Sequence, residues 1–224
     1  MRKLIVLSFI SLDGVMQAPG GPDEDPTGDF NYGGWTVGYW DDFLGGVMDE
    51  QMAKPFDLFL GRKTYEIFAA YWPYVKSDDP DGPLADRLNS AKKNVVSTTL
   101  GKLDWSNSTL IKDDIVQEIK KLKQQDGPEL QVHGSSNLIQ TLLKHDLIDD
   151  FRLKIFPIIL GPGKRLFGDG TIPAGLKLID SRTSTTGVIV ASYERAGDVK
   201  TGSFDLETPT EAELARRKRL IEEG

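Results

Sequence analysis

The chain of 224 residues carries 34 acidic and 27 basic residues, a formal net charge of −7 at pH 7. Nucleic acids and anionic membranes require broad basic surfaces, so this charge argues against both as main partners. With no cysteine, disulfides, thiolate metal sites and a cysteine nucleophile are excluded, and two histidines, His133 and His145, are too few for a typical zinc site.

The N-terminal apolar run, residues 4–10, is followed by "SLDG" without a convincing cleavage site. A first core strand is therefore a better interpretation than a signal peptide. No other run approaches the roughly 18 apolar residues of a membrane span. We expect a globular protein of the cytoplasm.

Eight apolar runs of strand length follow one another along the chain, at residues 3–10, 56–60, 94–97, 108–111, 129–133, 150–157, 176–181 and 187–194. Four helical patterns lie between them, at residues 40–54, 62–72, 113–125 and 135–146. Strands and helices alternate until about residue 150, and three strands then follow without a helix. This order predicts an α/β fold with a mostly parallel sheet, helices on both faces, and a final antiparallel hairpin around residues 185–187.

Two segments depart from this pattern. Residues 17–39 are rich in Gly, Pro and Asp and too long for an ordinary connection, so they form either a lid over a site or a disordered insertion. Aromatic residues within the segment, Phe30, Tyr32, Trp35 and Tyr39, favour a packed lid. We expect one domain over residues 1–197, and a tail over 198–224 whose helix starts near residues 208–211 and either packs on a neighbour or frays.

The stretch "LFLGRKTYE" places Gly61, Arg62, Lys63 and Thr64 between a strand and a helix. Glycine lets the backbone approach a ligand, and a helix start offers unpaired N–H groups and a positive dipole end. The two cations and the hydroxyl add the charge and donors that a phosphate needs. The alternative, in which Gly61 eases a turn and the cations are solvated, stays open.

A second strand-to-helix junction has the same character, with Gly134, Ser135, Ser136 and Asn137 in "HGSSNLIQ", and a third strand ends in "VSTT" at residues 96–99. The ends of parallel strands share one edge of a sheet, where open α/β folds bind nucleotides. Two such helix starts suit a dinucleotide, although no Gly-x-Gly-x-x-Gly fingerprint is present. "GPGKRLFG" (161–168) is not a P-loop; it is a surface turn whose Lys164 and Arg165 could still reach a phosphate.

Five motifs together resemble the dihydrofolate reductase superfamily: "SLDGVM", "LGRKTYE", "VVSTTL", "GSSNLIQTLL" and "LIDDFRLKIFPIILGPGKRLF". Over residues 2–195 the chain is more closely similar to the C-terminal reductase domain of bifunctional riboflavin-pathway deaminase-reductases and its stand-alone relatives. The resemblance implies a dihydrofolate reductase-like fold, NADPH as cofactor, hydride transfer and a homodimer. The zinc deaminase half needs cysteines and is missing.

The resemblance also implies roles for particular residues. Arg62 and Thr64 would grip phosphate, Ser97 and Thr98 would lie near the adenosine 2′-phosphate, and the loop at residues 11–16 would hold the nicotinamide carboxamide through its backbone. Residues 134–138 would wrap the pyrophosphate. The expected cofactor contacts are Ser11, Gly14, Met16, Gly61, Arg62, Lys63, Thr64, Ser97, Thr98, Gly134, Ser135, Ser136, Asn137 and Leu138.

Asp13 is the carboxylate nearest the expected nicotinamide loop and is a weak catalytic candidate, because an Asp-Gly pair after a strand is more often a turn. A histidine at a strand end, such as His133, more often has a structural role than a catalytic one. His145 suits a helix C-terminus. No metal site is expected.

The sequence therefore predicts an NADPH-dependent reductase of a small heterocyclic or carbonyl substrate, similar to 5-amino-6-(5-phosphoribosylamino)uracil reductase of riboflavin biosynthesis. One alternative is a pterin or dihydrofolate-type reductase, which requires Asp41, Asp42 or Asp49 to face the nicotinamide. The other is a nucleotide-binding module without catalysis. A ribosyl phosphate would need a second basic cluster, for which only residues 164–165 and Arg182 are available.

Overall fold

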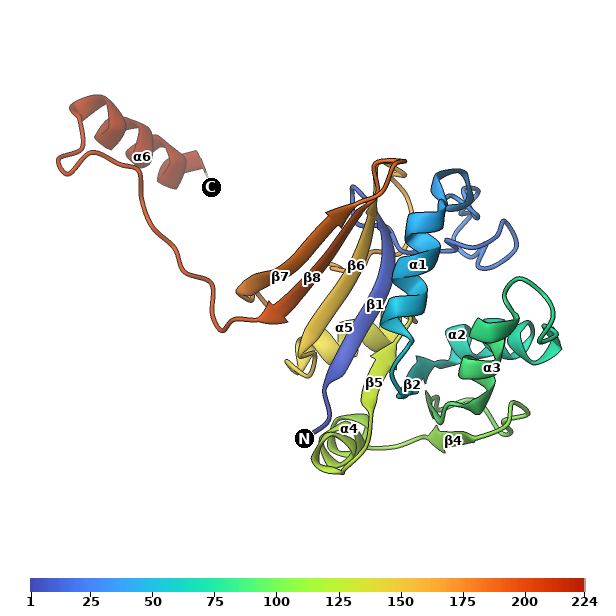
Figure 1. The fold of residues 1–224 in the computed structure, drawn as a ribbon. Coiled ribbons are helices and arrows are strands. Elements are labelled where there is room, and N and C mark those ends of the chain that lie inside the picture. The colour runs from blue at the N-terminus through green and yellow to red at the C-terminus, as the bar shows by residue number, and fades with distance from the viewer. Residues whose placement is uncertain (224) are drawn as a thin grey trace.

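The computed structural model describes residues 1–223, which form one eight-stranded sheet and its covering helices (Figure 1). The strand order is β4-β3-β2-β5-β1-β6-β8-β7. The strands are β1 (Leu4–Ser11), β2 (Phe56–Gly61), β3 (Lys93–Val96), β4 (Ser108–Ile111), β5 (Glu129–Val132), β6 (Asp150–Phe156), β7 (Leu176–Thr183) and β8 (Ile189–Arg195). β1 to β6 pair in parallel, whereas β8 runs antiparallel to both β6 and β7. The predicted α/β fold and its final antiparallel hairpin are confirmed.

The helices are α1 (Asp42–Gln51), α2 (Arg62–Ala69), α3 (Gly82–Ser90), α4 (Ile115–Gln124), α5 (Ser136–Lys144) and α6 (Glu211–Glu223), with short 3₁₀ turns η1 (Val37–Tyr39) and η2 (Trp72–Tyr74). Helix α3 was not predicted, because it begins with Gly82-Pro83 after a run rich in Asp and Pro, a composition typical of turns. No helix of residues 1–223 is long and apolar enough to cross a membrane.

Successive side chains of a strand point to opposite faces of the sheet, and here they pack into two cores, one on each face. Phe59 of β2 packs with Ile119 of α4 and Ile139 of α5. Its neighbours Leu58 and Leu60 pack with residues of α2 and α3 on the other face. Helices therefore cover both faces, and the strand ends are left free at one edge of the sheet.

The segment at residues 17–39 is packed. Phe30 and Trp35 are buried in a cluster with Leu44 of α1 and Phe156 of β6. The Trp35 Nε1–H donates to the Gln17 carbonyl at 2.8 Å, which ties the two ends of the segment together. The segment thus has a fixed place beside the carboxyl ends of the strands.

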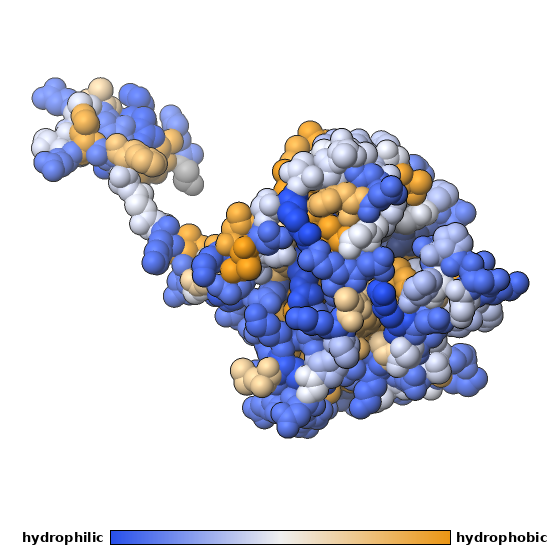
Figure 2. Space-filling model, in the orientation of Figure 1, coloured by the Kyte–Doolittle hydropathy of each residue, from blue (hydrophilic) through white to orange (hydrophobic). Residues whose placement is uncertain are grey.

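The tail leaves the end of β8 and carries α6 away from the sheet (Figure 1). No residue of α6 is buried. Figure 2 shows a largely hydrophilic surface on this face, with apolar side chains gathered near the point where the tail departs. Strand β7 forms the sheet edge there, and Leu178 and Ile179 are about half exposed (51% and 54%).

Candidate active site

A cavity of about 480 Å³ opens at the carboxyl ends of β1, β2, β3 and β5. Twelve of the predicted cofactor contacts line it: Met16, Gly61, Arg62, Lys63, Thr64, Ser97, Thr98, Gly134, Ser135, Ser136, Asn137 and Leu138. The other lining residues include Phe9 of β1, His133, and Gln17, Glu24 and Asp25 of the 17–39 segment. The sequence motifs thus converge on one cavity although they are far apart in the chain.

The two strand-to-helix junctions pack against each other at the floor of this cavity. The Thr64 backbone N–H donates to Ser135 Oγ at 3.3 Å, and the two hydroxyls lie 3.0 Å apart. A Cβ at Gly61 would meet Ser135 Oγ at 2.5 Å, so glycine is needed here for the close approach of the second junction. The peptide between Gly134 and Ser135 is cis.

The N-termini of α2 and α5 both face the cavity, and neither helix is capped by the side chain of its own N-cap residue, Gly61 or Ser135; in the first turn of α2, only the Thr64 N–H is bound by Ser135 Oγ. Backbone N–H groups of a first helical turn have no partner within the helix, and the helix dipole makes this end positive. Two neighbouring helix starts therefore offer donors and positive potential to an anion with more than one charged group.

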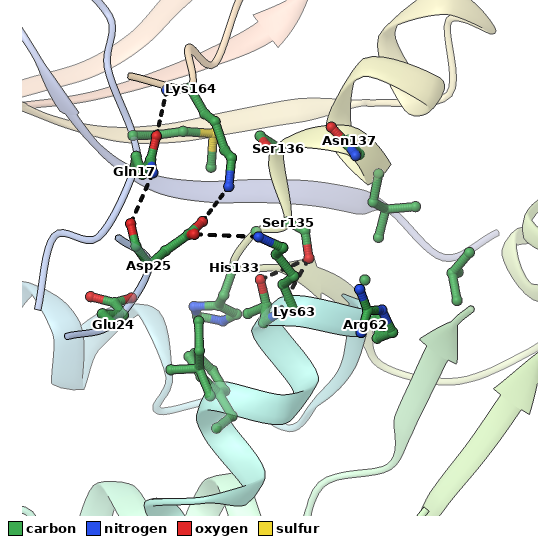
Figure 3. A pocket seen from close by; sticks show the side chains of 18 of the residues that line it. Gln17, Glu24, Asp25, Arg62, Lys63, His133, Ser135, Ser136, Asn137 and Lys164 are labelled. Carbon is green, nitrogen blue, oxygen red and sulfur yellow. Dashed lines mark hydrogen bonds and ion pairs between the residues drawn. The ribbon is translucent and has the colours of Figure 1, made fainter. Parts of the chain in front are cut away.

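Two lysines extend this positive potential, and an acid of the 17–39 segment binds both. Asp25 accepts from Lys63 Nζ at 3.3 Å and from Lys164 Nζ, and Thr27 Oγ1 lies 3.2 Å and 2.8 Å from the same two amines. Figure 3 shows Lys63 and Lys164 reaching Asp25 from different sides of the cavity. Burial raises the pKa of Asp25, but bonds from Lys164 and Thr27 outweigh this effect and hold the pKa at about 2.

Gln17 fixes the acid in this place. Its side-chain Nε2–H donates to the carbonyls of Asp25 and Thr27, both at 2.8 Å, while its Oε1 accepts from the Lys164 backbone N–H at 3.0 Å. Gln17 is 4% exposed. The 17–39 segment is therefore held over the cavity with its carboxylate inside the positive region.

Arg62 lies at the outer part of the cavity, where it pairs with Glu66 at 3.3 Å. Both side chains are 45% exposed, so this pair is weak and leaves the guanidinium free to turn toward a ligand. Beyond it, Ser97 Oγ accepts from the backbone N–H groups of Thr99 and Leu100, which shapes the turn after β3, while Thr98 is exposed.

The loop at residues 11–16 is held mainly by Asp13. Its carboxylate accepts from Ser11 Oγ at 2.6 Å, from Leu160 N at 3.1 Å and from Gly161 N at 2.9 Å. Burial raises the pKa of Asp13, but these bonds dominate and bring it to about 2. Ser11 and Gly14, which were predicted to contact the cofactor, and Asp13 are not among the residues that line the cavity, whereas Met16 is. This geometry favours a loop-fixing role for Asp13 over proton donation.

The carboxylates of α1 are engaged away from the cavity. Asp41 caps the helix through Leu44 N at 2.9 Å and binds Thr185, and Asp49 pairs with Arg87 at 2.9 Å. Asp42 is exposed. Among the described residues, the acids that line the cavity are Glu24 and Asp25, both from the 17–39 segment. Sequence reasoning missed them, although "DEDP" is the most acidic stretch of that segment.

The family model for the RibD C-terminal domain matches residues 2–190. The chain belongs to this family. Uncharacterized protein YyaP of Bacillus subtilis (strain 168) is 30% identical over 200 residues, which is 88% of this chain and 96% of YyaP.

Two solved structures share the fold of this RibD C-terminal domain protein. One is a protein from Shewanella sp. PV-4 provisionally named as a riboflavin biosynthesis protein, with 25% identity, a TM-score of 0.60, and 87% of this chain and 99% of that chain covered. The other is dihydrofolate reductase from Enterococcus faecalis, complexed with NADP(H), with 12% identity, a TM-score of 0.51, and coverage of 86% and 96%. The fold is dihydrofolate reductase-like.

Proposed function

We propose that this protein is an NADPH-dependent reductase that transfers a hydride to a small heterocyclic or carbonyl substrate. The main support for the proposal is that the N-termini of α2 and α5, neither of them capped by its own N-cap side chain, line one cavity at the ends of parallel strands. Membership of the RibD C-terminal domain family supports it, since that domain resembles the reductase half of riboflavin-pathway enzymes.

The residues of the cavity fit a dinucleotide with several phosphates. The first turns of α2 and α5 would bind the pyrophosphate through backbone N–H groups, and Lys63 and Lys164 would add charge once Asp25 is displaced. Arg62 and Thr98, which are exposed at the far end, would bind the 2′-phosphate that distinguishes NADPH from NADH.

When bound, NADPH supplies the hydride, and the protein positions the acceptor carbon against it. Phe9, Met16 and His133 line the cavity and would hold a planar ring. Glu24 is half-buried in the same lining, and burial raises its pKa. Glu24 is therefore better suited than Asp13 to hold a proton near the substrate.

The substrate we favour is similar to 5-amino-6-(5-phosphoribosylamino)uracil. A pterin is less well supported, because the acids of α1 that would bind it cap the helix, pair with arginine or face solvent. We further propose that the protein works in the cytoplasm on a small molecule and forms a homodimer. The remaining alternative, a nucleotide-binding module, would bind NADPH without oxidising it in the presence of any carbonyl or heterocyclic compound.

To test this proposal, the dissociation constants of NADPH and of NADH are measured for the wild-type protein and for the Arg62→Ala variant. We expect the variant to bind NADPH about tenfold more weakly, because a charge-assisted bond to phosphate is lost, and to bind NADH nearly unchanged. Lys120→Ala removes an exposed cation of α4 outside the cavity lining and is the matched control. An unchanged NADPH constant in Arg62→Ala would remove Arg62 from the site.

A further inference from the structure

His133 stands at the end of a line of polar side chains on one face of β5. Residues 129, 131 and 133 point to the same side because side chains alternate along a strand. That side is covered by α1, since Gln131 contacts the Gln51 carbonyl at the end of that helix. Figure 3 shows His133 beside the cavity, near Glu24 and Asp25. The line therefore runs from the interior of the sheet to the cavity wall.

Hydrogen bonds along this line fix the orientation of the Gln131 amide. Arg152 forms a two-bond pair with Glu129, at 2.7 Å and 2.8 Å. Gln131 Nε2–H donates to Glu129 Oε1 at 2.7 Å and to the Gln51 carbonyl at 3.1 Å. Both partners only accept hydrogen bonds here, so the NH₂ group must face them and Gln131 Oε1 must face the other way.

This orientation assigns the tautomer of His133. Its Nε2 lies 3.1 Å from Gln131 Oε1, an acceptor, so Nε2 carries the hydrogen and Nδ1 carries a lone pair. Burial, and then the charges of Lys154 and Arg152 on β6, lower the pKa of His133 to about 3. The imidazole is therefore neutral at physiological pH and acts as an acceptor at Nδ1.

No hydrogen bond from the other described residues reaches the Nδ1 atom. Within residues 1–223, the buried side-chain nitrogen and oxygen atoms without a partner are Ser108 Oγ and Arg182 Nε, so the unpaired Nδ1 of His133 is not enclosed by protein. His133 itself lines the cavity together with Phe9 and Met16, which offer apolar surface to a planar ring.

We propose that His133 Nδ1 accepts a hydrogen bond from a ring N–H of the substrate, so that His133 selects heterocycles that present a donor at this point of the cavity. The proposal rests on the proposed reductase function only in calling the occupant a substrate. Gln131 is a positioning residue, because it holds the imidazole in the accepting tautomer.

The experiment is ¹⁵N NMR of the imidazole groups in the full chain at neutral pH, with uracil or 1,3-dimethyluracil added. Uracil has two ring N–H donors, and its dimethyl derivative has none. His145, the other histidine, caps the C-terminus of α5 outside the cavity lining and is an internal reference. We expect His133 to carry hydrogen on Nε2, and uracil to shift its Nδ1 resonance whereas 1,3-dimethyluracil does not.

Two variants separate hydrogen bonding from packing. His133→Phe keeps a ring but has no acceptor atom. It should lower the preference for uracil, measured as the ratio of the dissociation constants of 1,3-dimethyluracil and uracil, about tenfold. His133→Asn keeps an acceptor oxygen near the position of Nδ1 and should retain most of the preference. Thermal unfolding of both variants checks that they fold. If one variant does not fold, the NMR result on the wild-type protein still tests the proposal.

Three results would overturn the proposal: hydrogen on Nδ1 of His133, a charged imidazole at neutral pH, or an Nδ1 resonance that uracil does not shift selectively. None of these readouts needs NADPH or turnover. If NADPH does not bind, the proposed function is rejected, but the role of His133 is not decided. If His133 does not accept a hydrogen bond, this proposal is rejected, but the proposed function is not.

Discussion

The hydroxyl of Thr64 lies 3.0 Å from the hydroxyl of Ser135, and this contact joins the first turns of α2 and α5. The two residues are 71 positions apart in the chain, and each lies close after a glycine that makes room for the other: Ser135 directly follows Gly134, and Thr64 lies three residues after Gly61. A Cβ at Gly134 would lie 2.8 Å from Thr64 Oγ1, just as a Cβ at Gly61 would strike Ser135. The close packing of the two helix starts, where we propose that the cofactor phosphates bind, thus depends on two glycines.

Gly61→Ala tests this packing. The added methyl would lie 2.5 Å from Ser135 Oγ and 2.9 Å from its Cβ, so the variant should lose about 1–3 kcal/mol of unfolding free energy in urea denaturation. The loss should shrink in a Ser135→Gly background, where both atoms are absent. Gly101→Ala, whose methyl meets no atom within 4 Å, is the control. Equal losses at positions 61 and 101 would contradict the close-packed junction.

Asp25→Asn tests whether the 17–39 segment competes with the cofactor. The carboxylate of Asp25 neutralises Lys63 and Lys164 inside the region assigned to phosphate. Removing its charge while keeping its shape should tighten NADPH binding by roughly three- to tenfold, measured by calorimetric titration. Asp23→Asn removes an exposed charge of the same segment and should change little. Weaker NADPH binding by Asp25→Asn would show that Asp25 supports the bound state instead.

Because the pKa of buried Lys154 is lowered, we expect the stability of the protein to depend on pH. Burial, then the charge of Arg152, lower the pKa of this 1% exposed amine to about 7 in the folded chain, against an ordinary value of 10.5. Between these values the unfolded chain binds a proton that the folded chain has released, so the free energy of unfolding rises as pH increases from 7 to 10.5.

Lys154→Met should reduce this rise by roughly 1 kcal/mol or more, since one pKa unit corresponds to about 1.4 kcal/mol. Part of the rise remains, because burial also lowers the pKa of Lys93, to about 8. Denaturant unfolding at several pH values measures the effect, and exposed Lys120→Met is the control. A rise in Lys154→Met as steep as in the wild-type protein would refute the assignment.

From the exposed position of strand β7 at the edge of the sheet, we expect an interface between two copies of the chain. It is the last strand of the sheet, and seven of its eight residues are exposed, including Leu178 and Ile179. An exposed apolar edge strand is a site for association. We expect a dimer by light scattering, which Leu178→Glu with Ile179→Glu converts to a monomer. Tyr74→Glu, at a 78% exposed aromatic residue of η2, should leave the dimer intact; a monomeric wild-type protein would disprove the expectation.

The strands, helices α1, α2, α4 and α5, the start of the tail helix α6, and twelve of the residues that line the cavity could be predicted because short local patterns specify them. A glycine between an apolar strand and a polar helix start, as at residues 61 and 134, predicts the junction wherever it lies. The contacts of Asp25 could not be predicted, since its two lysines lie 38 and 139 residues away and only the packed 17–39 segment brings them together. The accepting tautomer of His133 likewise depends on Gln51, Glu129 and Arg152, which meet through the sheet and α1.

Calorimetric titration of the wild-type protein with NADPH, and in parallel with NADH, tests the central claim most directly. From the two helix starts, Lys63, Lys164 and Arg62 we expect saturable NADPH binding with one molecule per chain, a dissociation constant in the micromolar range, and weaker binding of NADH. If neither nucleotide binds below millimolar concentration, the protein is not an NADPH-dependent reductase.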